Sequence, residues 1–242
     1  MDHSRIYGLN ACLQFAKHRQ EKIVRAFFSK KIAPQFSALM KSLASQKKVY
    51  RIIENDELEK VSQSQHHEGV CFIVEKNPLL SAKDFFKNKT QEPLVVLENI
   101  GNPHNLGAIM RICAHFGIQT IAMNDGKIAQ SGAALRIAEG GAEFIQIVEY
   151  KNLRDFVSEL KKAEYQILTT SSHEGKILYQ YKFPPKFVLL FGEEGRGLSQ
   201  EAMGLGQACL QIPGTQNVES LNVSTAISVI LGEVYRQKNF KG

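Results

Sequence analysis

The sequence predicts an α/β protein in which a small α/β domain precedes a larger domain built on a parallel sheet. Across residues 94–237, short apolar stretches alternate with amphipathic ones, as in sheets whose two faces are both covered by crossover helices. The length of 242 residues, with 43% hydrophobic and 22% charged, suits one large or two small globular domains. A lysine-rich segment with proline near both ends separates the two parts. We therefore expect domains at residues 1–75 and 93–242, joined by a linker at 76–92.

In the first domain, apolar residues between positions 7 and 48 recur at helical spacing and are interrupted by Pro34. This spacing predicts two or three amphipathic helices. A short strand is expected at residues 49–53, followed by a helix capped by Asn55 or Asp56. Gly69 then opens a second strand at residues 70–75.

The second domain alternates regularly between strands and helices. The expected strands occupy residues 94–98, 119–123, 144–148, 166–170, 187–191 and 209–212. One helix is expected to begin near residue 105, and a helical stretch interrupted by glycines is expected to end at residue 140. Further helices are expected at residues 152–163, 199–203 and 220–237. In an open parallel sheet, ligands bind beyond the carboxyl ends of the strands. The loops that follow the strands are therefore the expected binding site.

The net charge of +6 lies entirely in the first part of the chain. Residues 93–242 hold 14 cationic and 14 acidic side chains, whereas residues 1–92 hold 16 and 10. Within residues 17–51, ten lysines and arginines accompany a single acid, Glu21, which gives a local charge of +9. A solvated surface normally mixes both signs, so this concentration predicts a polyanionic partner.

Several classes of protein and site are disfavoured. No apolar stretch approaches the ~20 residues of a membrane span, and residues 1–10 lack the apolar core of a secretory signal, so we expect a cytoplasmic protein. The four cysteines show no CxxC spacing and have apolar neighbours, which predicts buried free thiols. The adjacent His66 and His67 predict a turn before the next strand. No metal site is expected.

Three loops of the second domain are rich in glycine, asparagine and charge, namely residues 98–107 (ENIGNPHNLG), 192–197 (GEEGRG) and 212–222 (IPGTQNVESLN). The second loop lacks the lysine and hydroxyl residue of a Walker loop, and its two carboxylates, Glu193 and Glu194, would repel phosphate. No GxGxxG follows any expected strand. A nucleotide-dependent oxidoreductase or NTPase is therefore disfavoured, although simple turn geometry remains an alternative explanation for the glycines of the second loop taken alone.

Taken together, three sequence motifs resemble, in order and spacing, those of the SpoU/TrmH family of RNA ribose 2′-O-methyltransferases, within the SPOUT superfamily. They are NPHNLGAIMR at residues 102–111, LLFGEEGRGL at 189–198 and IPGTQNVESLNVS at 212–224, referred to below as motifs 1, 2 and 3. The segments IYGLNA (6–11) and HHEGV (66–70) resemble the L30e-like substrate-binding domain of one branch of that family. The resemblance implies a deep trefoil knot that forms the S-adenosylmethionine pocket, a homodimer, and tRNA or rRNA as substrate.

The resemblance also implies which residues form the site. Those that would bind the cofactor are Thr169, Gly192, Ile212, Leu221 and Asn222. Those tied to the chemistry are Asn105, Arg111, Glu193, Ser220 and Asn222. We expect Glu193 to orient Arg111 or Asn105 by a charge-assisted hydrogen bond, with plain solvation of the loop as the alternative. Ser220 and Asn222 also lie where an N-cap of the last helix is expected, so capping is a second role for both.

Arg111 follows Asn105 by six residues, nearly two helical turns, so the two side chains can face one site. An arginine is a poor base because its pKa exceeds 12. A better role is to clamp an RNA phosphate and stabilise the developing oxyanion, which leaves the proton to the phosphate or to water. His104 is an alternative general base, although a solvated loop histidine is the favoured interpretation of this residue.

Four positions depart from the usual family pattern: Glu98, Asn102, Gly214 and Gln216. These departures keep open a second interpretation, a non-catalytic RNA-binding protein that has retained the fold. The presence of all five residues tied to the chemistry argues for the enzyme.

Overall fold

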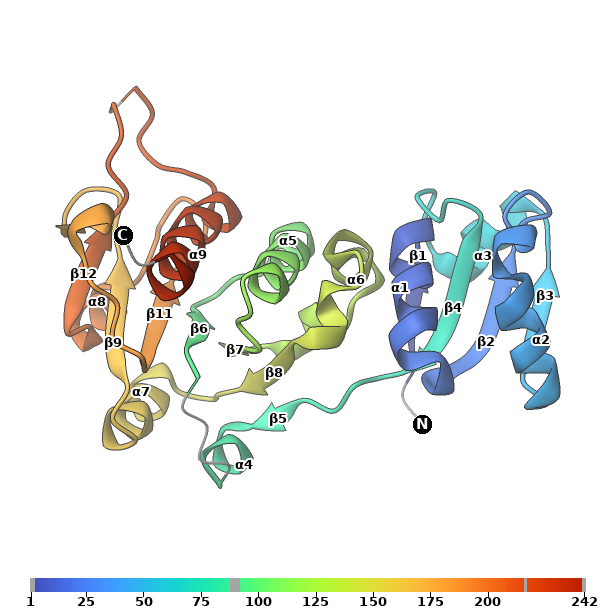
Figure 1. Ribbon diagram of the computed structural model, residues 1–242, viewed down its shortest axis with the longest axis horizontal. Helices are drawn as coiled ribbons and strands as arrows, with labels where there is room; N and C mark the ends of the chain where they lie inside the picture. The colour runs from blue at the N-terminus through green and yellow to red at the C-terminus, as the bar shows by residue number, and fades with distance from the viewer. Residues whose placement is uncertain (1–2, 88–91, 216, 241–242) are drawn as a thin grey trace.

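The described residues of the computed structural model, 3–87, 92–215 and 217–240, form two β-sheets, each with its own helices (Figure 1). We call the part around the first sheet, residues 3–75, the N-terminal unit, and the part around the second the C-terminal unit. The expected α/β class is confirmed in both. No helix in these described ranges is long and apolar enough to cross a bilayer.

The sheet of the N-terminal unit has four strands in the order β1-β4-β2-β3. Its strands are β1 (His3–Tyr7), β2 (Ile23–Phe28), β3 (Val49–Ile52) and β4 (Val70–Glu75). Its helices are α1 (Leu9–Arg19), α2 (Ser37–Ser45) and α3 (Asn55–Ser62), with short 3₁₀ helices at Gln20–Lys22 and Ala33–Phe36. The rings of Phe28, Phe36 and Phe72 lie 5.1–5.9 Å apart and fill the core with offset and edge-to-face contacts.

The expectation of helices throughout residues 7–48 was wrong for β2. Its apolar residues fit a helical spacing, yet the IVRAFF segment is rich in β-branched and aromatic side chains. Pairing with β4 on one side and β3 on the other decides its conformation. The sequence reasoning also missed β1, which pairs antiparallel with β4. The helix expected near Asn55 begins there, but Glu54 occupies its N-cap position.

The C-terminal unit holds an eight-stranded sheet in the order β10-β12-β9-β11-β6-β7-β8-β5, and every pair in it is parallel. Its strands are β5 (Leu80–Ser81), β6 (Leu94–Leu97), β7 (Thr120–Met123), β8 (Gln146–Glu149), β9 (Gln166–Thr170), β10 (Lys176–Ile177), β11 (Phe187–Phe191) and β12 (Ala208–Gln211). Strands β6 and β11 are buried along their whole length, as expected for a sheet covered on both faces.

Helices cover both faces of this sheet, which confirms the expected layers. One face packs against α5 (Pro103–His115), α6 (Gly132–Ala138) and α9 (Val223–Asn239) through a core that includes Ile109, Met110 and Ile230. The other packs against α4 (Ala82–Lys87), α7 (Leu153–Lys162) and α8 (Gln200–Leu205). Three 3₁₀ helices lie at Gly126–Gln130, Gly141–Phe144 and Leu178–Gln180.

Three boundaries differ from expectation. The segment taken as a linker contains α4 and β5, and β5 extends the sheet by pairing with β8. The strand expected at residues 144–148 starts two residues later because a 3₁₀ helix occupies Gly141–Phe144. The last helix begins at Val223 rather than at Ser220 because Asn222 caps it. A knotted path for the C-terminal segment stays a prediction.

The two units touch along α6 and the neighbouring 3₁₀ helices. Ser4 Oγ donates to the carbonyl oxygen of Gln130 at 3.1 Å, and Arg19 Nε lies 3.6 Å from Glu143 Oε2. A cavity of about 280 Å³ lies between the units and is lined by Arg19, Lys22 and Glu143 among others. Of the described residues of the three motifs only Met110 of motif 1 lines this cavity, and none of the residues expected to form the site does, so the cavity does not identify the reaction site.

Candidate active site

The motif loops follow three parallel strands of the C-terminal sheet, β6, β11 and β12, at their carboxyl ends. Motif 1 follows β6 and motif 2 follows β11, its neighbour in the sheet. The Glu98 carboxylate accepts hydrogen bonds from Ser199 N at 2.9 Å and Ser199 Oγ at 2.7 Å, and Glu98 N donates to the Phe191 carbonyl at 2.8 Å. Glu98, one of the departures from the family pattern, therefore ties the loop after β6 to the end of the motif 2 loop.

Asn222 joins all three motifs. Its Oδ1 accepts from Ser224 N at 2.9 Å and thereby caps α9. Its Nδ2 donates to Asn105 Oδ1 and to Glu194 Oε1, each at 3.1 Å. We call Asn105, Glu194 and Asn222 the motif hub. The amide donor and amide acceptor of one asparagine let the same side chain fix a helix start and hold two other loops.

The motif 2 loop depends on glycine at Gly192. This residue is buried at the end of β11, and a Cβ placed on it would lie 2.0 Å from the carbonyl carbon and oxygen of Gly197. The loop folds back tightly because Gly197 N donates to the Glu193 carbonyl at 2.9 Å. Gly195 and Gly197 adopt positive φ angles of 82° and 69°, which favour glycine. Turn geometry is thus a real requirement of this loop and coexists with any binding role.

The residues expected to hold the cofactor lie around the same strand ends. Ile212 is half-buried directly after β12, and Leu221 is 44% exposed immediately before the motif hub residue Asn222. Thr169 differs from them because it is buried within β9, where its Oγ1 donates to the Ala208 carbonyl at 3.3 Å. Its hydroxyl is therefore already engaged by β12.

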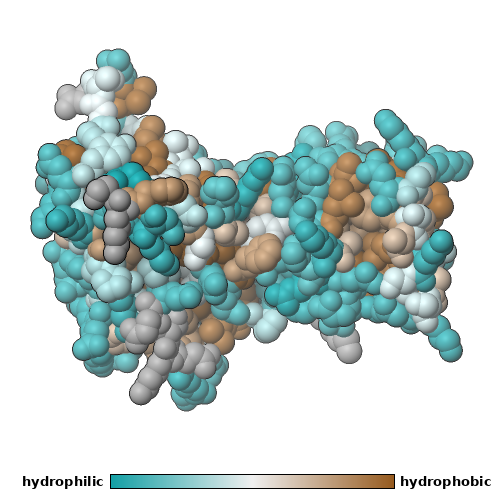
Figure 2. All heavy atoms as spheres, viewed as in Figure 1, coloured by the Kyte–Doolittle hydropathy of each residue, from teal (hydrophilic) through white to brown (hydrophobic). Residues whose placement is uncertain are grey.

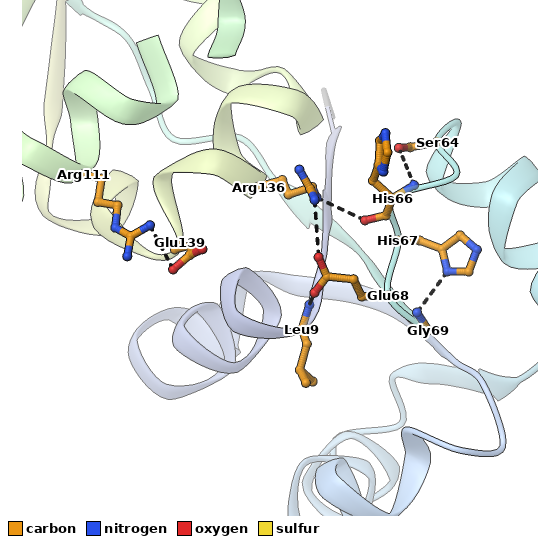
Figure 3. Close-up of polar contacts among 9 residues, drawn as sticks. All are labelled: Leu9, Ser64, His66, His67, Glu68, Gly69, Arg111, Arg136 and Glu139. Carbon is orange, nitrogen blue, oxygen red and sulfur yellow. Dashed lines mark hydrogen bonds and ion pairs between the residues drawn. The ribbon is translucent and has the colours of Figure 1, made fainter. Parts of the chain in front are cut away.

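Arg111 has a different partner from the expected one. Its Nη1 lies 3.1 Å from Glu139 Oε2 at the end of α6 (Figure 3). Glu193 instead lies 3.5 Å from Arg196 Nε within its own loop, because the bridge between Glu193 and Gly197 closes that loop on itself. The expected contact of Glu193 with Arg111 or Asn105 was therefore wrong, and Glu194 is the carboxylate that joins the Asn105 group.

Sequence reasoning missed Glu139 altogether. It lies outside the three motifs, and the only local signal is the Gly140-Gly141 pair that follows it. A Cβ on Gly141 would lie 2.8 Å from Arg111 Cα, so the missing side chain lets the end of α6 approach α5 closely. Ser220 lies exposed in the loop before α9, two residues ahead of the cap.

Like Glu98, a second departure from the family pattern has a clear setting. Asn102 caps α5 by accepting from His104 N at 2.9 Å, so an asparagine fills the capping position as well as an aspartate would. Gly214 is exposed, with open space where a side chain would point. Gln216 lies outside the described residues.

His67 and three of the four cysteines have structural settings. His67 Nδ1 accepts from Gly69 N at 3.0 Å, which confirms the expected turn before β4. Cys12, Cys71 and Cys113 are buried free thiols, as expected, whereas Cys209 is only half-buried, so the expectation was wrong for it. Burial raises the pKa of Cys71 to about 12, so this thiol stays protonated at neutral pH. Within residues 3–87, 92–215 and 217–240, no group of histidine, cysteine or acidic side chains has the arrangement of a metal site.

The chemistry of these loops fits S-adenosylmethionine. Leu221 and Val218, which is 71% exposed, present apolar side chains on the motif 3 loop that an adenine ring can cover. The nearby Glu194 carboxylate is exposed apart from its contact with Asn222. A negative side chain suits a positively charged sulfonium group and disfavours the phosphates of ATP or a dinucleotide.

Comparison with known proteins identifies the family. The SpoU rRNA Methylase family matches residues 92–232, and the family described as RNA 2′-O ribose methyltransferase substrate binding matches residues 5–80. The chain belongs to the SpoU rRNA Methylase family, as the three motifs predicted. The expected class of RNA methyltransferase is confirmed with it.

Two relatives and one solved structure illustrate this. The chain is 39% identical over 237 residues to the uncharacterized tRNA/rRNA methyltransferase YfiF of Escherichia coli O157:H7, covering 98% of this chain and 69% of that protein. It is 27% identical over 239 residues to the 23S rRNA (guanosine-2′-O-)-methyltransferase RlmB of Escherichia coli K12, covering 97% and 98%. The AdoMet-bound rRNA methyltransferase of Sinorhizobium meliloti has the same fold, with a TM-score of 0.80, 21% identity and coverage of 99% and 88%.

Proposed function

We propose that this protein transfers the methyl group of S-adenosylmethionine to a ribose 2′-hydroxyl of rRNA or tRNA. The motif hub carries the proposal, because Asn222 joins Asn105 of motif 1 and Glu194 of motif 2 at the carboxyl ends of the strands. The names of its relatives support it. RlmB is a 2′-O-methyltransferase of 23S rRNA guanosine.

The cofactor would lie against Gly192, Ile212 and Leu221, with Asn222 beside it, and Thr169 would contribute through β9. When bound, it supplies the methyl group. The chain's own residues then position the RNA. Asn105 and Asn222, fixed by their mutual hydrogen bond, place the loop that faces the ribose, and the Ser220 hydroxyl can bond to the ribose from the motif 3 loop. Glu193 contributes by holding the motif 2 loop closed.

Arg111 acts on the reacting oxygen. Its guanidinium clamps a phosphate beside the target nucleotide and stabilises negative charge on the 2′-oxygen as the proton leaves. Because this guanidinium stays protonated, the proton passes to the phosphate or to water. Such positioning can supply much of the rate, since methyl transfer needs three atoms in line.

The N-terminal unit would dock the RNA. Several cations of its basic segment are exposed, including Lys31, Lys41 and Arg51. Arg51 follows Tyr50 on β3, an edge strand with every residue exposed, and apolar side chains reach the surface at that end of the molecule (Figure 2). Successive side chains of a strand point to opposite faces, so Tyr50 is available for stacking on an unpaired base while Arg51 is available for a phosphate on the other side. Arg19 and Lys30 are less available to RNA, because they form ion pairs with Glu143 and Glu54, respectively.

We also propose a homodimer in the cytoplasm, where the proposed RNA substrates are found. The apolar side chains of Ile227, Ile230 and Leu231 on α9 are buried in the core of the subunit, so they are not available for a dimer contact. The exposed rings of Tyr235 and Phe240 lie 6.3 Å apart at the end of the same helix and offer an apolar contact instead.

One experiment tests the function directly. Total RNA from a strain lacking the protein is incubated with the purified protein and methyl-labelled S-adenosylmethionine, and the modified nucleotides are mapped by mass spectrometry. We expect one new ribose 2′-O-methylation. RNA binding without any transfer would favour the non-catalytic alternative, and calorimetry with S-adenosylhomocysteine, NADH and ATP separates both from the nucleotide-dependent classes.

A further inference from the structure

The turn at residues 136–141, which ends α6, is held by the N-terminal unit on one side (Figure 3). Arg136 Nε donates to the His66 carbonyl at 3.2 Å, and Arg136 Nη2 donates to Glu68 Oε1 at 3.4 Å. The other oxygen of Glu68 accepts from Leu9 N at 2.9 Å. A Cβ on Gly140 would lie 2.3 Å from the Gln14 side chain of α1. The turn is therefore packed against two segments of the N-terminal unit.

On its other side the same turn holds Arg111. Glu139 occupies the C-cap of α6 with φ 45° and ψ 44°, a left-handed conformation that is uncommon for a glutamate. This conformation directs its carboxylate to Arg111 Nη1 at 3.1 Å. Gln63 ends α3 in the same left-handed conformation, so this backbone geometry serves to end a helix, and the contact with Arg111 is what distinguishes Glu139.

We propose that Glu139 is a positioning residue for Arg111, holding the guanidinium in place for the phosphate of the substrate RNA. This inference rests on the proposed function. Arginine has a long side chain with five N–H donors. A single contact through Nη1 restricts that side chain and leaves the remaining donors for a phosphate. Because the N-terminal unit packs against the turn that carries Glu139, the unit that docks RNA also sets the position of Arg111.

The exposure of the Arg111–Glu139 ion pair determines how much its loss should lower kcat. The side chains of Arg111 and Glu139 are 59% and 38% exposed, so their ion pair is weak in water and restrains rather than locks the arginine. Replacing Glu139 with glutamine should lower kcat by roughly three- to fivefold while KM for RNA changes less than about twofold. Removing Arg111 itself should cost at least about 100-fold.

A matched control separates positioning from net charge. Glu159 forms an exposed ion pair with Lys162 at 2.6 Å on α7, on the opposite face of the sheet from α5. Glu159→Gln makes the same charge change as Glu139→Gln, so it should leave both kcat and KM unchanged. In an Arg111→Lys background, Glu139→Gln should cause no further loss of kcat, because lysine lacks the guanidinium group that Glu139 positions.

The experiment combines kinetics with NMR of the full-length protein. Arginine side-chain ¹⁵N spectra without RNA should show slower rotation of the Arg111 guanidinium in the wild type than in Glu139→Gln. Identical spectra would overturn the contact even if no RNA substrate were found, so this readout is independent of the proposed function. With an active wild type, an unchanged kcat in Glu139→Gln would overturn the positioning role. So would a lowered KM at full kcat, which would make Glu139 a competitor of the phosphate.

Discussion

The side-chain amide of Asn222 donates a hydrogen bond to Oδ1 of Asn105 over 3.1 Å, across 117 positions of sequence. The same asparagine caps α9, so its two roles need to be separated. Asn222→Ala should lower the free energy of unfolding by about 1 kcal/mol because the helix cap is lost. It should also lower the rate of methyl transfer.

Asn222→Ser separates these two roles. Serine caps a helix about as well as asparagine but has no amide to reach Asn105 or Glu194. We expect thermal unfolding within about 2 °C of the wild type and a kcat reduced by at least about tenfold. A serine variant with full activity in the methyl-transfer assay would show that the link between Asn222 and Asn105 is dispensable.

The cofactor pocket is best tested at Leu221. Gly192→Val is a poor test, because a Cβ on Gly192 would lie 2.0 Å from the Gly197 backbone and would disrupt the loop itself as well as the pocket. Leu221 is 44% exposed, so Leu221→Ser removes little packing from the folded protein. We expect S-adenosylhomocysteine affinity to fall about tenfold for the loss of one apolar contact.

Calorimetric titration measures this affinity, and the unfolding temperature checks the fold. Val223→Ser serves as a contrasting variant, because Val223 is buried beside the same loop and its loss should lower stability. Unchanged affinity in Leu221→Ser would remove Leu221 from the pocket.

RNA docking by the N-terminal unit predicts a salt dependence that follows its exposed cations. Replacing Lys31, Lys41 and Arg51 with alanine should weaken binding and lower the slope of log affinity against log salt by about 2 to 3. Filter binding across a salt series measures the slope. Deleting residues 1–76 is a less clean test, because it would also remove the contacts of Arg136 with His66 and Glu68.

The control for this prediction replaces three exposed lysines of the C-terminal unit, Lys161, Lys182 and Lys238, with alanine. Both triple variants lose the same charge. Equal loss of slope in the two would assign the effect to net charge rather than to docking by the N-terminal unit.

Glu143 predicts a pH dependence of stability. Burial raises the pKa of Glu143 from 4.5 to about 7, although Arg19 and Lys22 oppose the shift, and its Oε2 is buried without a hydrogen bond. The folded protein therefore binds a proton more tightly than the unfolded chain. The contribution of Glu143 to the free energy of unfolding is fully present below pH 4.5, declines as the pH rises through 7 and then levels off. The total decline is on the order of 3 kcal/mol at most.

Glu143→Gln carries no titrating group and should remove this decline. Unfolding temperatures measured from pH 5 to pH 8 should coincide for the two proteins at the acid end, and the variant should be more stable by several degrees at pH 8. Parallel curves across the whole range would mean that Glu143 keeps an ordinary pKa.

The sequence predicted the C-terminal sheet well because its buried strands are continuous apolar segments and its motif loops follow them directly. It failed at β2, where apolar spacing fits a helix and only pairing with β3 and β4 decides the strand. It also failed at Glu139, because no local pattern reveals which carboxylate a long arginine side chain will meet. Contacts between distant segments, set by packing, account for both errors.

The strand order of the C-terminal sheet has a kinetic consequence. Strands β5 to β8 form one side of the sheet and β9 to β12 the other, and the two sides meet where Leu94 of β6 pairs with Val188 of β11. A chain emerging from the ribosome has β6, β7 and β8 available long before β11. Closing this central pairing joins residues far apart in sequence, so it should be the slow step of folding. Until it closes, one side of β6 presents an open strand edge in the nascent chain.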